Sequence, residues 1–256
     1  MLFGYCSTVE YCKQVADTGF DYIELYGREI TALDEKSFFE VKKNLEALGL
    51  PCRGFAVSVP PEVRLCGPGY DRDIVSEYAK RCCARGAALG ILHIGIGSPS
   101  SRNLPDGFDM DLAYAQIMEA LQIFCAEARP YSINILLESV SSPLCNFVTR
   151  FPEASAVVEQ MNIDNLYLLL DLYHLAVMDE TLADYQSMLG NVKHVHIADK
   201  ADNGQLRYEN EQQYRQWISF LKAEGYDVSI SVEALPPDPS DSRRSLEILR
   251  RIDKNI

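Results

Sequence analysis

Four side chains that can bind a metal ion stand where apolar runs of the sequence end: Glu138, Asp171, His196 and Glu233. Three carboxylates and one imidazole placed together would repel one another or shift their pKa values strongly, and a divalent cation relieves that repulsion. Three oxygen ligands and one nitrogen ligand suit Mn²⁺, Mg²⁺ or Co²⁺ better than a metal selected by thiolates. A solvated strand end explains any one of these residues, but it explains four in succession less well.

Only the fold can bring these four residues together, because they lie 33, 25 and 37 positions apart. Several of the preceding runs are apolar on both faces, which is typical of parallel strands covered on both sides. Such runs recur along the chain, over residues 2–6, 22–25, 53–57, 91–96, 134–137, 166–170, 192–197 and 228–232. Helical patterns alternate with them, over residues 9–18, 35–48, 73–89, 110–129, 152–161, 181–189, 211–224 and 242–252.

This alternation of eight strands and eight helices, at about 32 residues per unit, predicts a (β/α)8 TIM barrel formed by residues 1–256 as one domain. The rival is a doubly wound open sheet, which is expected to carry a glycine-rich phosphate-binding turn after its first strand. The residues 4–8, GYCST, are not such a turn. In a barrel the carboxyl ends of all strands meet at one mouth, so the four candidate ligands are expected within a few ångströms of one another.

Composition and charge exclude several other classes of function. The chain has 256 residues, 47% of them hydrophobic, and a formal net charge of −13. This is the composition of a globular protein, and the acidic excess opposes a nucleic acid or an anionic membrane surface as partner. No run approaches the roughly 18 apolar residues of a membrane span. The eight cysteines form no Cys-x-x-Cys pair, which favours reduced thiols and a cytoplasmic protein.

Six stretches of the sequence have the pattern of a known family. They are Leu137-Glu138, LDLYH at 170–174, HVHIAD at 194–199, GY at 225–226 with SISVE at 229–233, ADTGFDYIEL at 16–25, and GS at 97–98 with RNLPDGF at 102–108. In these stretches the chain resembles the xylose isomerase-like TIM barrel superfamily, in its sugar phosphate isomerase/epimerase branch. That branch includes ketose 3-epimerases, hydroxypyruvate isomerases and inosose dehydratases. The resemblance covers nearly the whole chain, and it is more specific for the superfamily than for a substrate.

The resemblance implies that Glu138 and Glu233 are both metal ligands and the catalytic acid–base pair, on opposite faces of a bound ketose. One divalent ion, Mn²⁺ with Mg²⁺, Co²⁺ or Zn²⁺ as alternatives, would chelate the carbonyl and hydroxyl oxygens of the substrate and stabilise an enediolate. One glutamate removes a proton, and the other returns it to the opposite face or to the neighbouring carbon. The protein is then expected to be an isomerase or epimerase of a small sugar, sugar phosphate or related ketone. The alternatives are a dehydratase (a lyase) of an inosose-type polyol ketone, and a non-catalytic sugar-binding barrel.

The resemblance also implies contacts with the substrate. His174, three residues after Asp171, is expected to reach a substrate oxygen near the metal. The other expected contacts are Glu24 at the mouth end of the second strand, Arg102 after the fourth strand and Arg207 after the seventh. Two further histidines are expected elsewhere: His93 in the core below the mouth, and His194 as a core residue or a hydrogen-bond partner behind a ligand.

Two departures from the family narrow the choice of relative. Ketose 3-epimerases carry an acidic residue six positions after the first metal-binding glutamate; here that position is Leu144, which leaves Asn146 as an approximate polar substitute. The related apurinic endonucleases use three zinc ions, and the four histidines of this chain are too few for that cluster. We therefore expect a small carbohydrate as partner, with no nucleic acid and no membrane, in a chain that can form a homo-oligomer.

Overall fold

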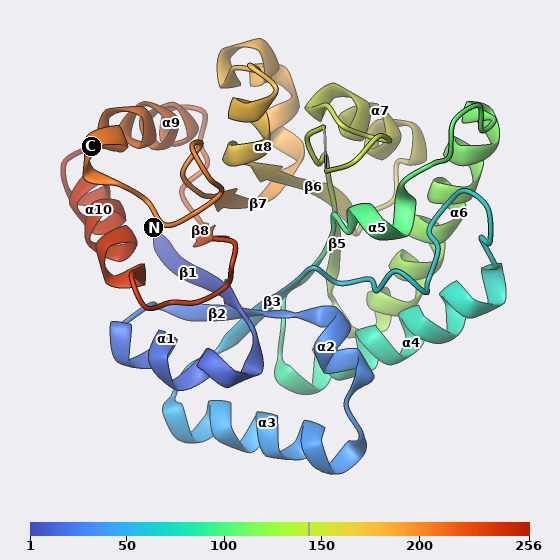
Figure 1. The fold of residues 1–256 in the computed structure, drawn as a ribbon, viewed down its shortest axis with the longest axis horizontal. Coiled ribbons are helices and arrows are strands. Elements are labelled where there is room, and N and C mark those ends of the chain that lie inside the picture. Colours follow the sequence, from blue (N-terminus) through green and yellow to red (C-terminus); the bar gives the residue numbers. More distant parts are fainter. Residues whose placement is uncertain (143) are drawn as a thin grey trace.

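Eight parallel strands close into a barrel in the order in which they occur in the sequence, from β1 to β8 and back to β1 (Figure 1). The computed structural model describes residues 1–142 and 144–256, and it confirms the predicted (β/α)8 barrel. The strands are β1 (Leu2–Ser7), β2 (Tyr22–Tyr26), β3 (Cys52–Ala56), β4 (His93–Ile96), β5 (Asn134–Glu138), β6 (Leu166–Asp171), β7 (Val192–Ile197) and β8 (Ser229–Val232).

Helices surround the strands on the outside of the barrel (Figure 1). They are α1 (Cys12–Thr18), α2 (Gly27–Ala32), α3 (Glu35–Leu48), α4 (Arg72–Leu89), α5 (Pro99–Arg102), α6 (Met110–Ala128), α7 (Phe151–Met161), α8 (Leu172–Val177), α9 (Glu211–Ala223) and α10 (Ser242–Lys254). The helix predicted over 181–189 is a 3₁₀ segment, Leu182–Asn191. The short helices α2, α5 and α8 lie just beyond the ends of strands, and none is long enough for a helical period to show in the sequence.

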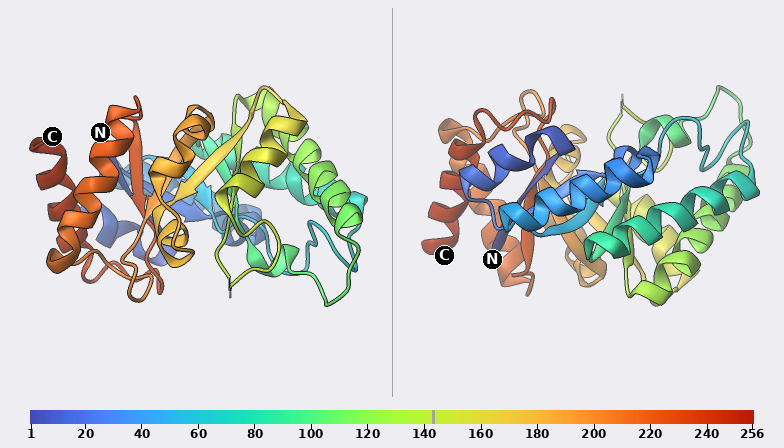
Figure 2. Two further views of the ribbon diagram at one scale, coloured as in Figure 1. Left: turned by 90° about the horizontal axis from the view of Figure 1, so that it is seen from above. Right: turned by 90° about the horizontal axis from the view of Figure 1, so that it is seen from below.

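The two ends of the chain lie close together. The amino terminus of Met1 lies 3.4 Å from a carboxylate oxygen of Asp253 in α10, and the two termini lie side by side in all three views (Figures 1 and 2). This contact lies beside the β1–β8 pairing, where the barrel closes. Among the described residues, no helix combines the length and apolar composition that a membrane span requires. All eight cysteines carry free, buried thiols.

Buried aliphatic side chains form most of the core between strands and helices, but the barrel interior also contains a polar group of side chains. Parallel pairing sets Glu24 level with Cys6 on one neighbouring strand and with Gly54 on the other, and Gly54 level with His93. On the other side of the barrel, Leu169 is level with His194, and Asp171 with His196. The register thus decides which side chains occupy the mouth and which occupy the level below it.

Candidate metal centre

The four residues at the ends of β5 to β8 converge at one end of the barrel. Glu138 and Asp171 are the last residues of β5 and β6, His196 is the last but one of β7, and Glu233 follows β8 directly. Each offers one ligand atom, and these four atoms lie within 4.8 Å of one another. The side chains are buried or nearly so. Together the four side chains offer three oxygen donors and one nitrogen donor.

The close packing of these four side chains shifts the pKa values of the two glutamates in opposite directions. Burial and the neighbouring carboxylates of Glu233 and Asp171 raise the pKa of Glu138 well above its usual value. Burial also tends to raise the pKa of Glu233, but the His196 imidazole, whose Nδ1 lies 2.9 Å from Glu233 Oε2, outweighs it and brings the net pKa below the usual value. Neighbouring carboxylates pushed in opposite directions are typical of a catalytic or metal site.

Two further observations fit a cation at this position. Glu138 Oε1 is buried and has no hydrogen-bond partner among residues 1–142 and 144–256, although buried polar atoms are nearly always paired. Residue 97, just beyond β4, is a glycine, and a Cβ added there would lie 2.0 Å from Glu138 Oε2. The chain leaves that space open for the carboxylate. An unpaired acceptor in a set of three oxygens and one nitrogen fits a hard or borderline divalent metal ion.

Asp171 also fixes the start of the next element. Its Oδ1 accepts hydrogen bonds from the backbone N–H groups of Tyr173 and His174 at 2.7 and 3.2 Å, which caps α8. The cap holds His174 over the site, where its Nε2 lies 3.9 Å from Glu138 Oε1 and 3.9 Å from Asp171 Oδ2. The other ring nitrogen, Nδ1, lies 2.9 Å from the hydroxyl of Ser141. The structure therefore places His174 beside the candidate ligands, on the side that faces the cavity.

A cavity of about 260 Å³ opens directly on the ligand set. Glu138, Glu233 and His174 line its inner end, and its volume suits a small metabolite. Two residues that the sequence reasoning missed also line it: Tyr26 and Arg28. The strand was expected to end at residue 25, but β2 runs to Tyr26. Because the strand is longer than expected, Tyr26 and Arg28 lie at the mouth. Their position at or just after the end of a buried strand is the sequence signal that could have identified them.

The predicted place of Glu24 is wrong. Because β2 runs to Tyr26, two residues past Glu24, the Glu24 carboxylate lies inside the barrel below the mouth, and its side chain is fully buried. His194 Nε2 lies 2.5 Å from its Oε1, and His93 Nε2 lies 3.0 Å from its Oε2. A carboxylate enclosed in this way has no open face for a sugar. The core positions expected for His93 and His194 match the structure.

The two arginines expected to bind substrate are engaged elsewhere. Arg102 is fully buried, and its guanidinium donates to the backbone oxygens of Glu138 at 2.9 Å and Val148 at 3.4 Å. It therefore supports the end of β5 from behind. Arg207 forms ion pairs with Asp202 and, at 3.8 Å, with Asp199, and it is not among the residues that line the cavity. Both were misplaced because the folding of long loops decides where such side chains end.

Asn146, expected as a polar substitute in the cavity, faces another loop. Its side chain accepts from the backbone N–H of Leu104 at 2.9 Å and donates to the Leu104 carbonyl at 2.8 Å. Leu144 is the residue of this segment that lines the cavity, and its side chain is 43% exposed. The cavity wall is therefore apolar at the position where ketose 3-epimerases carry an acid.

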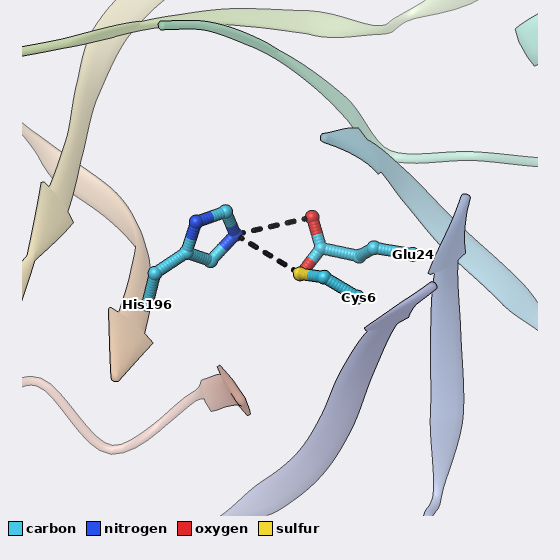
Figure 3. A group of neighbouring side chains, drawn as sticks. All are labelled: Cys6, Glu24 and His196. Atoms are coloured by element: carbon cyan, nitrogen blue, oxygen red, sulfur yellow. Dashed lines mark hydrogen bonds and ion pairs between the residues drawn. The ribbon is translucent and has the colours of Figure 1, made fainter. Parts of the chain in front are cut away.

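Behind the ligand set, Cys6 and Glu24 point from β1 and β2 toward the same nitrogen of His196 (Figure 3). His196 Nε2 lies 3.4 Å from Glu24 Oε2 and 3.7 Å from Cys6 Sγ. Burial opposes a charge on this imidazole, but Cys6, Glu233 and Glu24 raise its pKa well above the usual value. The two ring nitrogens thus face opposite levels of the barrel.

Comparison with known proteins agrees with this fold. The model of the family described as "Xylose isomerase-like TIM barrel" matches residues 12–252. An inosose isomerase of Halalkalibacterium halodurans is 25% identical over 248 residues, which cover 90% of this chain and 82% of the relative. A 2-oxo-tetronate isomerase of Haemophilus influenzae is 26% identical over 224 residues, covering 82% of this chain and 83% of the relative.

Solved structures share the fold over the whole chain. A D-psicose 3-epimerase crystallised in the presence of D-fructose superposes with a TM-score of 0.82 at 16% identity, covering 98% of this chain and 99% of the other. An IOLI protein with a bound zinc atom superposes with a TM-score of 0.70 at 17% identity, covering 100% and 97%. At these identities the likeness establishes the barrel and its topology.

Proposed function

We propose that this chain, which belongs to the xylose isomerase-like TIM barrel family, is a divalent-metal-dependent isomerase or epimerase of a small sugar, sugar phosphate or related ketone. Its curated relatives are named as isomerases of such compounds, which supports an enzyme of this kind. The observation that carries the proposal is the pair Glu138 and Glu233. Both belong to the four-donor set, and both line the same cavity.

Glu138, Asp171, His196 and Glu233 would hold one divalent ion, with Mn²⁺ as the first candidate and Mg²⁺, Co²⁺ or Zn²⁺ as alternatives. When bound, the ion supplies Lewis acidity at the carbonyl end of the substrate. The protein side chains carry out the proton transfer. Glu138 and Glu233 face the cavity and can remove and return a proton at the substrate carbon between them. Their pKa values are shifted in opposite directions, as an acid–base pair requires.

His174 is the group best placed to bind a substrate oxygen. Its Nδ1 is held by Ser141, which leaves Nε2 directed at the side of the cavity that holds Glu138 and Asp171. An imidazole fixed by a hydroxyl on one nitrogen can present the other to a substrate hydroxyl. The apolar walls, such as Val140 and Leu144, narrow the remaining space and help to exclude water from the reacting carbon.

The test is a screen of ketoses, ketose phosphates and inososes with the purified chain and added Mn²⁺, Co²⁺ or Mg²⁺, read by the identity of the product. Glu138→Gln and Glu233→Gln should each abolish turnover of any substrate found. Glu46→Gln, on the exposed face of α3, is the matched control and should retain it. Full activity in either of the first two variants refutes the paired-glutamate mechanism. A dehydrated ketone as product in place of an isomer assigns the site to the lyase class.

A further inference from the structure

A carboxylate that the reaction does not use lies one level below the metal ligands. Glu24 is fully buried, and three imidazoles surround it. His194 Nε2 is 2.5 Å from Oε1, His93 Nε2 is 3.0 Å from Oε2 and His196 Nε2 is 3.4 Å from Oε2. The hydroxyl of Ser231 also donates to Oε1. These partners come from β4, β7 and β8, so they reach Glu24 across the barrel interior.

The surrounding chain supplies partners for this carboxylate. A buried carboxylate is tolerated only where donors satisfy it. The His194, His93 and His196 imidazoles and the Ser231 hydroxyl together cover both oxygens of Glu24. Residue 54 on the adjacent strand is a glycine, and a Cβ there would lie 2.2 Å from His93 Nε2 and 2.8 Å from Glu24 Oε2. The glycine makes room for the contact between Glu24 and His93.

Only one of the three imidazoles belongs to the ligand set. The Nδ1 atom of His196 faces that set, 2.9 Å from Glu233 Oε2, while Nε2 faces Glu24 and Cys6 (Figure 3). An imidazole that ligates a metal through one nitrogen must carry its proton on the other. A carboxylate behind that nitrogen fixes the tautomer and the ring orientation, and it makes the ligating nitrogen more basic. A thiol at 3.7 Å is a weaker acceptor than the carboxylate.

We propose that Glu24 is a positioning residue for the metal centre: it accepts the Nε2–H of His196 and thereby presents Nδ1 to the metal. The inference rests on the metal centre of the proposed function. His93, His194 and Ser231 hold the Glu24 carboxylate in place and do not contact the ion. The competing interpretation is a second metal site, since Glu24, His93 and His194 also offer donor atoms within 4.8 Å of one another. His93 and His194 form direct hydrogen bonds with Glu24, and this favours the role of Glu24 as a positioning residue over a second metal site.

Equilibrium binding of Mn²⁺ to the full chain tests the proposal. The protein is stripped with a chelator and titrated by calorimetry, with the number of ions per chain and the affinity as readouts. Glu24→Gln keeps the shape but replaces the charged acceptor, and it should weaken binding about 10- to 100-fold. Cys12→Ser, at a buried thiol of α1 in the core, is the control and should bind within about threefold of the wild type. Circular dichroism and thermal unfolding without metal verify the fold of each.

A second measurement needs no substitution at Glu24. Histidine labelled with ¹⁵N in the Zn²⁺-loaded protein reports which nitrogen of each ring carries a proton, and a His196→Gln variant assigns the signal. The proposal predicts a proton on Nε2 and none on Nδ1. A proton on Nδ1 of His196 overturns it. So does Glu24→Gln binding with wild-type affinity, and so do two ions bound by the wild type of which Glu24→Gln loses one. If the wild type binds no divalent ion at all, the proposed function fails with it.

The cavity supports a second, independent inference about the substrate. Arg28 is the only arginine or lysine that lines the cavity, and in the described part of the chain no carboxylate lies within 4.0 Å of its guanidinium. Its Cζ lies 5.8 Å from the ring centre of Tyr26. Tyr26 lines the same cavity, and its buried hydroxyl has no hydrogen-bond partner within residues 1–142 and 144–256. Arg28 and Tyr26 thus lie close together at the cavity, the first without a carboxylate partner and the second without a hydrogen-bond partner for its hydroxyl, among the described residues.

We infer that the substrate carries an anionic group, a carboxylate or a phosphate, that Arg28 binds with help from the Tyr26 hydroxyl. This inference rests on the proposed function and specifies its substrate class. Glu138, Asp171 and Glu233 leave the inner end of the cavity net negative by one charge after a divalent ion is bound to them. A neutral ketose gains little from an arginine beside such a site, whereas an anion needs one.

Binding of three ligands to the Mn²⁺-loaded chain separates the sources of the anion: neutral D-fructose, D-fructose 6-phosphate and 5-keto-D-gluconate. At least one anion should bind more tightly than D-fructose, and Arg28→Gln should weaken that anion about 10- to 100-fold while changing D-fructose by less than threefold. Arg215→Gln, on the outer helix α9, is the control. D-fructose binding as tightly as both anions, or an unchanged Arg28→Gln, overturns the inference and leaves the metal mechanism standing. No binding of any of the three counts against both.

Discussion

Replacing Gly97 by alanine should disable the site without removing any ligand. A Cβ at residue 97 would lie 2.0 Å from Glu138 Oε2 and 3.1 Å from Glu138 Cδ. Real Cβ atoms do not approach other atoms so closely, and an ordinary contact begins at about 3.4 Å. The Glu138 carboxylate must therefore move by more than about 1 Å. Since the moving group is the end of a flexible side chain, the fold itself should tolerate the change.

The functional cost follows from that displacement. A misplacement of about 1 Å at a reacting group lowers the rate by about 100-fold, and a carboxylate turned away from the ligand set also weakens metal binding. We expect the kcat/KM of Gly97→Ala on an identified substrate to fall about 100-fold. Its Mn²⁺ affinity should fall as well, while its free energy of unfolding without metal should change by less than about 1 kcal/mol.

Gly95→Ala on β4 is the matched control. Its Cβ would lie 3.1 Å from Leu169 Cδ1 and 3.3 Å from the Phe55 carbonyl oxygen, away from the ligands. Overpacking of this kind costs about 1–3 kcal/mol of stability, and Mn²⁺ affinity should stay at the wild-type value. Calorimetric titration with Mn²⁺ and urea unfolding of both variants give the comparison. Wild-type Mn²⁺ affinity and turnover in Gly97→Ala would show that the position of Glu138 does not set the geometry of the site.

Three further outcomes follow from the charges and hydrogen bonds around the ligands. Because the pKa values of Glu138 and His196 are both raised, Mn²⁺ must displace protons, so its affinity should increase with pH, and calorimetry in buffers of different ionisation enthalpy should count the protons released. The same two shifts favour the protonated folded state; without metal the melting temperature should therefore fall as pH rises from about 5.5 to 8.5, and Glu138→Gln should flatten that slope. Arg102→Met leaves the Glu138 and Val148 carbonyls without a buried donor, so urea unfolding should show a loss of about 2–4 kcal/mol.

The meeting of Glu138, Asp171, His196 and Glu233 was within reach of the sequence because two strong constraints coincide there. Each ligand stands at or near the end of an apolar run, and a closed parallel barrel brings all such ends to one mouth. The place of Glu24 needed finer information. Strand β2 extends to Tyr26, so Glu24 lies two residues before the strand end and, at about 3.3 Å per residue, roughly 6–7 Å deeper in the barrel than the mouth. An apolar run marks a strand, but it does not locate the end of the strand to one residue.

The roles of the arginines depended on loops, which sequence patterns describe poorly. Arg102 is buried because the segment after β5 folds over it and offers the Val148 carbonyl. Arg28 lines the cavity because the short helix α2 starts directly after β2. Both residues look alike in the sequence, as single cations after a strand. Their different surroundings arise from contacts between segments that are far apart in the chain.

The polar side chains below the proposed metal ligands can be tested for their role, which is either to orient His196 or to stabilise the barrel. TIM barrels usually fill their interior with branched aliphatic side chains, whereas here Glu24, His93 and His194 occupy that space. Replacing a buried ionic group as a whole by apolar side chains of similar volume is often neutral or stabilising, by about 1–4 kcal/mol, whereas removing one partner is costly. If this level exists to orient His196, the triple variant Glu24→Leu, His93→Leu, His194→Phe should unfold at the wild-type urea concentration or higher, yet bind Mn²⁺ at least 10-fold more weakly. A triple variant that is destabilised but binds Mn²⁺ normally would assign the polar level to the stability of the barrel and not to its metal centre.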